Sequence, residues 1–197
     1  MSDPRTRWGR ETRADAGEYD AQWDRMAARG IDPHGEVAFV MAYEPTSVLD
    51  AGCGTGRVAI ELARHAITTV GVDADASMIA EARRRAPDLE WEHADLVGLE
   101  LGRTFSVVVL AGNVPLFTAP GTQHALITSC AQHVAPDGLL VAGFQLGRGY
   151  SLAEFDASCG TAGLAIVNRW STWDRQPFST PGDYAVSVAS ASTAASA

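Results

Sequence analysis

The stretch VLDAGCGTGRVAIELARH, residues 48–65, decides the fold because an apolar run passes into a helix-like run through a cluster of glycines. Gly52, Gly54 and Gly56 occupy alternate positions in it. Glycine loses more conformational entropy on folding than any other residue, so such a cluster marks a tight turn or the close approach of a ligand to the backbone. The pattern therefore predicts a buried strand, a turn and then a helix.

The chain after this stretch continues to alternate between strand-like and helix-like segments. Strands are predicted at 47–51, 68–73, 89–95, 105–112 and 139–146, and helices at 57–66, 75–86 and 121–134. This alternation predicts a parallel sheet with crossover helices. After a predicted helix at 151–163, two strands at 164–174 and 183–190 follow one another directly, so we expect them to be antiparallel.

The two ends of the chain differ from this central part. We expect residues 1–44 to form an N-terminal arm with two helices, at 16–30 and 33–44, and residues 45–190 to form one α/β domain. The Ala/Ser-rich residues 191–197 are predicted to be a disordered tail.

Composition excludes several classes of function. The formal net charge of −9 and the isoelectric point near 4.9 argue against nucleic acid as a partner. The only dense basic stretch, EARRRAP at 81–87, suits a helix C-terminus. Three scattered cysteines and five scattered histidines show no metal-ligand spacing, so no metal is expected. Neither a signal peptide nor a membrane span is recognisable, which predicts a cytoplasmic protein.

Acidic residues follow the ends of the predicted strands, where ligands bind in open α/β sheets. Asp73 closes the second strand, and a carboxylate there can accept hydrogen bonds from both hydroxyls of a ribose. The ligand is therefore predicted to contain a nucleoside, which fits both dinucleotides and other adenosine compounds.

Two details favour an adenosine compound that carries a cation. The spacing G-x-G-x-G at Gly52, Gly54 and Gly56 differs from the G-x-G-x-x-G of dinucleotide-binding proteins. Asp50 lies in the strand two residues before the turn. A carboxylate in that place would repel a pyrophosphate and attract an ammonium or sulfonium group.

The segments VLDAGCGTGR, GVDAD, HADL and VVVLAGN together resemble the class I methyltransferases that use S-adenosylmethionine. The resemblance extends from about residue 45 to residue 146, and more loosely to residue 190. It implies an α/β fold with a doubly wound, mostly parallel seven-stranded sheet of order 3-2-1-4-5-7-6. The last strand would be antiparallel, and helices would cover both faces.

The resemblance also implies which residues hold the methionine part of the cofactor. Gly52, Cys53 and Gly54 would line it, and Asp50 would lie near its amino group. Asp50 has an alternative role, which is to cap backbone amides of the loop. Asn113, after the fourth strand, would lie near the departing methyl group or would serve only as a turn former.

For the adenosine part, the resemblance implies that Asp73 binds the ribose hydroxyls, with Ala74 beside it. Asp95 would accept from the adenine amino group, and Leu96 would offer its backbone N–H to the ring. Tyr19, in the first predicted helix, either packs on the sheet domain or forms part of a lid over the methyl donor.

The function implied is transfer of a methyl group from S-adenosylmethionine to a small-molecule acceptor. The loops at 113–121 and 145–154 would shape the acceptor pocket, with VPLF as an apolar wall and Arg148 either holding an acidic substrate or solvated. No residue is recognisable as a general base. Two alternatives stay open, an NAD-dependent oxidoreductase and a non-catalytic module that binds S-adenosylmethionine. The acceptor, the attacked atom and the oligomeric state are not predicted.

One position departs from the family pattern. Ser106 opens the fourth strand where many relatives have an acidic residue. That end of the strand is remote from the expected site, so we expect Ser106 to affect stability rather than activity.

Overall fold

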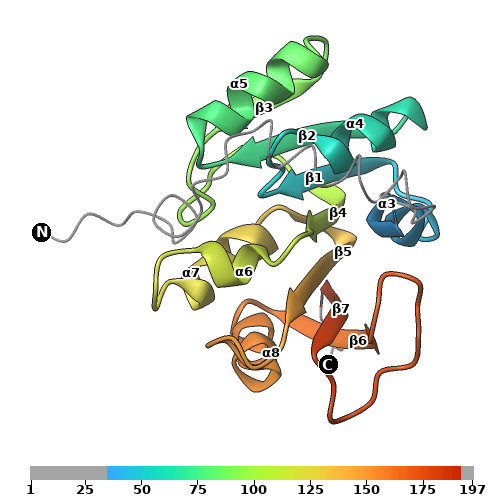
Figure 1. Cartoon of the computed structure of the whole chain (residues 1–197), viewed down its shortest axis with the longest axis vertical. Helices are drawn as coiled ribbons and strands as arrows, with labels where there is room; N and C mark the ends of the chain where they lie inside the picture. Colours follow the sequence, from blue (N-terminus) through green and yellow to red (C-terminus); the bar gives the residue numbers. More distant parts are fainter. Residues whose placement is uncertain (1–34, 192–197) are drawn as a thin grey trace, which may run out of the picture.

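The computed structural model describes residues 35–191 (Figure 1). The strands are β1 Ser47–Ala51, β2 Thr68–Asp73, β3 Glu90–His93, β4 Phe105–Leu110, β5 Val134–Gln145, β6 Leu164–Trp170 and β7 Tyr184–Ala191. The helices are α3 Gly35–Met41, α4 Arg57–Arg64, α5 Ala76–Arg85, α6 Val114–Phe117, α7 Gln123–Ala131 and α8 Leu152–Thr161. Helices separate most successive strands, whereas β4 follows β3 and β7 follows β6 with no described helix between them.

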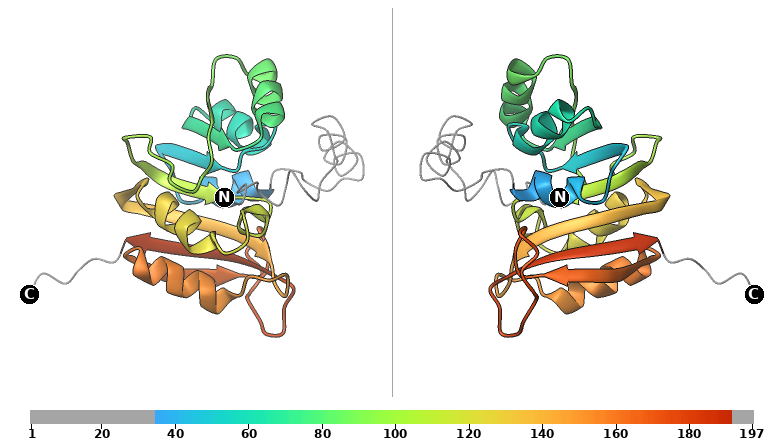
Figure 2. Two further views of the ribbon diagram at one scale, coloured as in Figure 1. Left: turned by 90° about the vertical axis from the view of Figure 1, so that its left-hand side faces the viewer. Right: turned by 90° about the vertical axis from the view of Figure 1, so that its right-hand side faces the viewer.

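The described strands form one sheet of seven strands in the order β3-β2-β1-β4-β5-β7-β6. The first five strands pair in parallel, whereas β7 is antiparallel to both β5 and β6. Figure 2 shows β3 and β6 at opposite ends of the sheet, with α8 beside β6. The predicted strand order and the antiparallel last strand are therefore confirmed.

Both faces of the sheet are covered, which explains why its central strands are apolar throughout. Val48 packs on one face with residues of α3 and α4, and Leu49 packs on the other with residues of α7 and α8. A third cluster joins α4 and α5 to Trp91 of β3. The buried faces hold the carboxyl ends of the parallel strands at one edge of the sheet, where the site is found.

Some boundaries differ from the prediction. The fifth strand was predicted at 139–146, but β5 begins at Val134, so the tripeptide Pro-Asp-Gly at 136–138 lies inside it. The pairing of β4 with β5 shifts register between Phe105 and Val107, so the strand absorbs the irregularity as a bulge. Gly138 permits this because a Cβ there would meet the carbonyl oxygen of Phe105 at 2.9 Å.

Two further boundaries differ near the site and at the end of the sheet. Residues 114–117, expected as loop, form the short helix α6, which has a proline in its first turn. The sixth strand ends at Trp170 rather than at residue 174, because residues 171–174 turn away from the sheet.

The N-terminal prediction is only partly covered by the structure. The helix expected at 16–30, with Tyr19, lies outside the described residues, and the helix expected at 33–44 is seen as α3. The Phe39 ring of α3 meets Trp173 edge-on at 5.3 Å, and the guanidinium of Arg175 lies 4.9 Å from its centroid. Helix α3 is therefore held by the connection between β6 and β7. Within residues 35–191, no helix combines the length and apolarity needed to cross a membrane.

Candidate functional site

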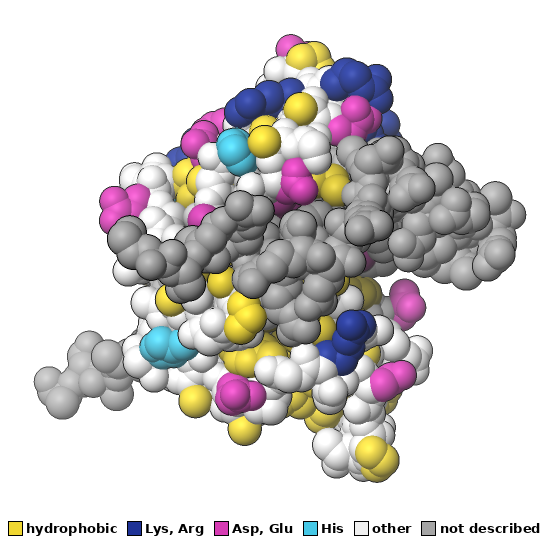
Figure 3. Space-filling view, turned by 60° about the vertical axis from the view of Figure 1, so that its left-hand side comes forward, with side chains coloured by type: hydrophobic (Ala, Val, Ile, Leu, Met, Phe, Trp, Pro, Cys, Tyr) yellow, Lys and Arg dark blue, Asp and Glu magenta, His cyan; other side chains and the backbone are white. Residues whose placement is uncertain are grey.

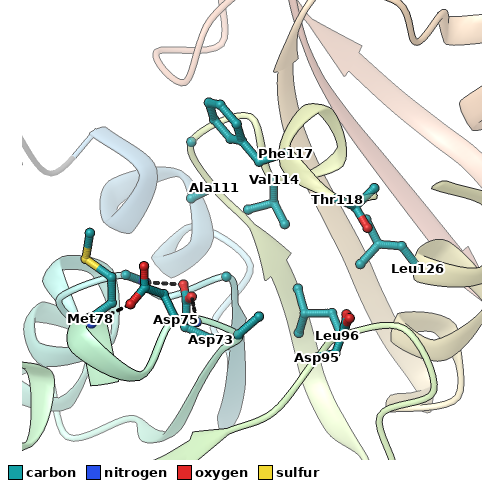
Figure 4. Close-up of a pocket in the computed structure, with 14 residues that line it drawn as sticks. Asp73, Asp75, Met78, Asp95, Leu96, Ala111, Val114, Phe117, Thr118 and Leu126 are labelled. Carbon is teal, nitrogen blue, oxygen red and sulfur yellow. Dashed lines mark hydrogen bonds between the residues drawn. The ribbon is translucent and has the colours of Figure 1, made fainter. Parts of the chain in front are cut away.

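A pocket with about 710 Å³ of empty space lies at the carboxyl ends of β1, β2, β3 and β4. Its lining residues are Gly52, Gly54, Asp73, Ala74, Asp75, Met78, Asp95, Leu96, Ala111, Gly112, Val114, Phe117, Thr118 and Leu126. In Figure 4, Asp73, Asp75 and Met78 line one side, whereas Val114, Phe117, Thr118 and Leu126 line the other. The pocket thus lies where strand order reverses, between β1 and β4, as expected for an open α/β sheet.

The glycine turn after β1 brings bare backbone to this pocket. Gly52 has φ +81° and donates its N–H to the carbonyl of Val72 at 2.8 Å. A Cβ on Gly52 would meet Cγ2 of Val114 at 2.6 Å, so only glycine lets α6 approach this closely. Gly54 has φ +54° and donates its N–H to Oδ2 of Asp73 at 2.8 Å. Both glycines are needed for left-handed backbone, as the sequence pattern indicated.

Asp73, the last residue of β2, organises the neighbouring loops. Its Oδ1 accepts the backbone N–H of Asp75 at 2.9 Å, while Oδ2 accepts that of Gly54. Burial raises the pKa of Asp73 above its ordinary value, and the two N–H donors partly counteract that rise. Asp75 caps α5 by accepting from the backbone N–H of Ser77 at 2.8 Å.

Asp95 and Leu96 reach the pocket from the loop after β3. Oδ1 of Asp95 accepts the backbone N–H of Val97 at 2.9 Å, which fixes the carboxylate at the pocket edge. The side chain of Leu96 is buried among the residues of the larger core cluster. The backbone of Ala94 donates to the carbonyl of Asp73 at 3.1 Å, so the ends of β2 and β3 are held together.

Asp50 does not line the pocket, and its carboxylate is buried beneath the glycine turn. Only 1 % of the residue is exposed, and Oδ2 accepts the backbone N–H of Ala59 at 3.1 Å. Gly56, the N-cap of α4, has no side chain to provide a cap, so Asp50 supplies the missing acceptor from β1. Burial raises the pKa of Asp50 to about 7, although the positive charge of Arg57 and the bond from Ala59 oppose that rise. The capping alternative therefore matches the observed geometry.

Cys53 and Asn113 also lie outside the pocket lining. Cys53 packs in the cluster around Trp91, and burial raises the pKa of its thiol well above the ordinary value. Asn113 has φ +68°, and its Oδ1 accepts the backbone N–H of Gln145 at 2.7 Å. Its own N–H donates to the carbonyl of Gly143 at 3.2 Å. Asn113 therefore ties the carboxyl end of β4 to that of β5.

Several lining residues were not predicted from the sequence. They are Asp75, Met78, Ala111, Gly112 and Leu126. The loop at 113–121 was predicted to shape an acceptor pocket with VPLF as an apolar wall, and its residues Val114, Phe117 and Thr118 line the pocket opposite Asp73. Met78 and Leu126 have the spacing of ordinary core positions on α5 and α7. No sequence signal separates such positions from pocket positions, because the difference depends on how the helices are placed.

The charges around the pocket are acidic. Three carboxylates line it, those of Asp73, Asp75 and Asp95, and none of the described lining residues is an arginine or a histidine. Within residues 35–191, no group of three or more His, Cys, Asp or Glu side chains is placed to hold a metal ion.

The basic stretch at 81–87 lies away from the pocket, in the last turn of α5. Figure 3 shows dark blue side chains gathered at the upper end of the molecule, where Figure 1 places α5. Arg83 donates to the carbonyl of Trp91 at 2.8 Å, and Arg85 donates to Oγ1 of Thr55 at 3.2 Å. These arginines thus hold α5 to β3 and to the glycine turn.

Comparison with known proteins agrees with this geometry. The family model described as "Methyltransferase domain" matches residues 48–138. A crystal structure of a TehB-like SAM-dependent methyltransferase from Corynebacterium glutamicum superimposes with a TM-score of 0.83 and 31 % sequence identity. The match covers 89 % of this chain and 97 % of that one. The chain belongs to the S-adenosylmethionine-dependent methyltransferases.

Curated relatives of this methyltransferase chain act on different acceptors. The dTDP-3-amino-3,6-dideoxy-alpha-D-glucopyranose N,N-dimethyltransferase of Streptomyces fradiae is 36 % identical over 134 residues, which are 64 % of this chain and 52 % of that protein. The tRNA1(Val) (adenine(37)-N6)-methyltransferase of Vibrio cholerae is 29 % identical over 104 residues, 49 % of this chain and 42 % of that protein. The chain thus spans about half the length of the curated relatives it matches.

Proposed function

We propose that the chain catalyses transfer of a methyl group from S-adenosylmethionine to a small-molecule acceptor. The observation that carries the proposal is the composition of the pocket. A glycine turn and three carboxylates, one of them Asp73 at the end of β2, face an apolar wall there. The alternatives considered are a dinucleotide-dependent oxidoreductase and a module that binds the cofactor without turnover.

The residues present fit the adenosyl part of the cofactor. Each oxygen of the Asp73 carboxylate accepts one backbone N–H, and a carboxylate oxygen has capacity for a further hydrogen bond, here from a ribose hydroxyl. Asp95 stands at the pocket edge, where Oδ1 accepts the backbone N–H of Val97, and Oδ2 is the acceptor we assign to the adenine amino group. The apolar side chains of Met78 and Leu126 suit the faces of a purine ring.

The charge of the pocket favours a sulfonium ligand over a pyrophosphate. Three carboxylates line the pocket, those of Asp73, Asp75 and Asp95. Like charges in a partly buried site repel by several kcal/mol at an effective dielectric of about 20, so a doubly charged pyrophosphate is disfavoured there. A cationic sulfonium or ammonium group is attracted by the same carboxylates. This argues for a methyl donor and against NAD.

When bound, S-adenosylmethionine supplies a methyl group already activated by its positive sulfur. The chain's own residues then need to orient the reactants and exclude water. Gly52 permits Val114 to approach the turn, which narrows the pocket on the methionine side. Asn113 holds the ends of β4 and β5 together through Gln145, which fixes the edge from which an acceptor would approach. We assign no general base, because none is needed for an acceptor that is unprotonated at neutral pH.

We propose a nucleotide-linked amino sugar as the acceptor class. The support is the likeness to the Streptomyces fradiae dimethyltransferase, whose name states such a substrate. The exposed Arg148 lies just after β5, and its Nη1 donates to Oε1 of Gln145 at 2.8 Å, so a cation stands at the acceptor edge for a diphosphate. The net charge of −9 disfavours a polynucleotide acceptor. A tRNA is the second candidate, on the likeness to the Vibrio cholerae enzyme.

Two experiments test this proposal. Isothermal titration with S-adenosylhomocysteine and with NADH should show binding of the first alone, and binding of NADH alone would overturn the cofactor assignment. Methyl-labelled S-adenosylmethionine should then transfer label to dTDP-amino sugars and not to tRNA. Label found on tRNA alone would overturn the amino-sugar proposal and make tRNA the acceptor. Binding without transfer to any acceptor of either class would favour a cofactor-binding module.

A further inference from the structure

Trp91 of β3 packs against the glycine turn and does not itself line the pocket. Trp91 is 5 % exposed, and it belongs to the apolar cluster that also contains Cys53 of the turn. A Cβ placed on Gly56 would overlap Cη2 of this indole and meet Cζ3 at 3.0 Å. The far edge of the indole therefore lies directly beneath the last glycine of the turn.

The strand pairing explains how an indole reaches this position. Asp50, Gly71 and Trp91 are register partners across β1, β2 and β3, so all three point to the same face of the sheet. A Cβ on Gly71 would overlap Cζ3 and Cε3 of Trp91 and lie 3.0 Å from Sγ of Cys53. Gly71 thus leaves the space through which the indole extends from β3 to the turn.

The indole is anchored at its other edge. Its Nε1 donates to the carbonyl of Ala86, just after α5, at 2.8 Å, and the backbone carbonyl of Trp91 accepts from Arg83 at 2.8 Å. The bond from Nε1 orients the ring and sets how far it extends toward Gly56, whereas the bond from Arg83 holds the strand that carries it. The turn rests on a rigid support rather than on a flexible side chain.

We propose that Trp91 is a positioning residue for cofactor binding. It supports the turn of Gly52, Gly54 and Gly56 from below, in the position in which Gly54 lines the pocket. The inference rests on the proposed function, because it concerns the affinity for the adenosyl cofactor. Gly56 donates its N–H to the carbonyl of Cys53 at 2.9 Å and so closes the turn, and Gly54 within it lines the pocket. A shift of Gly56 is therefore transmitted to the backbone that faces the ligand. In this reading Gly71 and Gly56 leave room for the indole, whereas Gly52 and Gly54 are the glycines of the turn that line the pocket.

A double-mutant cycle tests the role of Trp91, with S-adenosylhomocysteine binding measured by isothermal titration. Gly71 lies in an extended strand, so Gly71→Ala introduces a clash with the indole without strain in the backbone. We expect Gly71→Ala to weaken binding about tenfold in the wild type, and less than about twofold when Trp91 is also changed to Leu. Trp91→Leu alone should weaken binding about tenfold, because the turn loses its support.

A second measurement uses the ligand-free protein. Hydrogen exchange should become faster in residues 52–57 of Trp91→Leu and Trp91→Phe, with residues of β4 unchanged, since a phenyl ring is too short to reach Gly56. Phe155→Leu, a fully buried change in α8 on the other face of the sheet, is the control for general destabilisation. It should lower the melting temperature without changing either the affinity or the exchange of the turn.

The outcomes separate this inference from the proposed function. If the wild type does not bind S-adenosylhomocysteine, the proposed function fails. If the wild type binds it and the effect of Gly71→Ala is the same in both backgrounds, or Trp91→Leu binds as tightly as the wild type, the role of Trp91 is overturned. Should Gly71→Ala alone not fold, Trp91→Leu and its exchange rates decide the question.

Discussion

The carboxylate of Asp50 accepts a hydrogen bond from the backbone N–H of Ala59, with 3.1 Å between the two atoms. The bond joins β1 to the first turn of α4 and so fixes both ends of the glycine turn between them. It also places a carboxyl group in a site where 1 % of the residue is exposed. The strand and the helix on either side of the glycine turn are therefore coupled through one buried acid.

This burial predicts a pH dependence of stability. The pKa of Asp50 is raised to about 7 in the folded protein, compared with about 3.9 in an unfolded chain. The folded state thus holds the proton more tightly, and the contribution of Asp50 to the free energy of unfolding is lost as pH rises from about 4 to about 7. Relative to Asp50→Asn, the free energy of unfolding of the wild type should fall by on the order of 4 kcal/mol between these pH values. Urea unfolding between these pH values measures it, and parallel profiles for the two proteins would contradict the prediction.

Asp73→Ala should weaken the binding of S-adenosylhomocysteine by about 1–3 kcal/mol, because a charged acceptor of the ribose hydroxyls is lost. The substitution also removes the acceptor for the N–H groups of Gly54 and Asp75, so the turn itself loosens. Isothermal titration measures the effect. Asp88→Ala, at an exposed position after α5, is the matched control and should bind as the wild type does. Unchanged affinity in folded Asp73→Ala would remove the ribose role.

Gly54→Val should abolish measurable cofactor binding, because its φ of +54° is unfavourable for a β-branched residue and the side chain would enter the pocket. Gly121→Val provides the comparison, since Gly121 also has positive φ (+83°) but has nothing within 4 Å of a Cβ and does not line the pocket. Both variants should lose stability, and only Gly54→Val should lose affinity. Equal affinities would show that the turn does not contact the ligand.

Glu36 of α3 and Arg57 of α4 form a two-pronged ion pair, with distances of 2.7 and 3.0 Å and both side chains 10 % exposed. Arg57 begins a helix, where a cation is unfavourable, so the carboxylate of Glu36 offsets its charge. Glu36→Leu should destabilise the fold by about 3–5 kcal/mol, because the largely buried guanidinium of Arg57 loses the carboxylate of Glu36. The double variant Glu36→Leu/Arg57→Met should be less destabilised than Glu36→Leu alone. Chemical unfolding measures the free energy of unfolding of each variant. If the losses of the two single variants simply add in the double variant, the ion pair does not contribute to stability.

Ser106→Ala should lower stability by about 1–2 kcal/mol and leave cofactor affinity unchanged. The hydroxyl of Ser106 donates to the carbonyl of Ser47 at 2.7 Å and accepts the backbone N–H groups of Thr46 and Ser47 at 3.0 Å each. These bonds join β1 and β4 at the end of the sheet remote from the pocket. Parallel urea unfolding and titration experiments test both parts, and a loss of affinity would contradict the second.

The sequence by itself determined the fold and the position of the site along the chain. The apolar, β-branched runs ending at Ala51 and Leu110 predict strands that are covered on both faces, and alternation with helices predicts the parallel sheet. Glycine spacing and the terminal Asp73 predict a nucleoside site at the carboxyl ends of the strands. These features are local, because backbone conformation and hydrophobic periodicity depend on residues close together in the chain.

Only the tertiary structure decided what each of these residues contacts. The sequence allowed Asp50 to face the ligand or to cap amides, and the packing of α4 on β1 directs its carboxylate to Ala59. It grouped Gly56 with the ligand-facing glycines, and the register of β1, β2 and β3 places the indole of Trp91 beneath it instead. The sequence predicted VPLF as a pocket wall, and the close approach of Val114 to Gly52 is seen only in the structure. Such contacts join residues distant in the chain, so the pairing of strands and the packing of helices determine them, and local sequence does not.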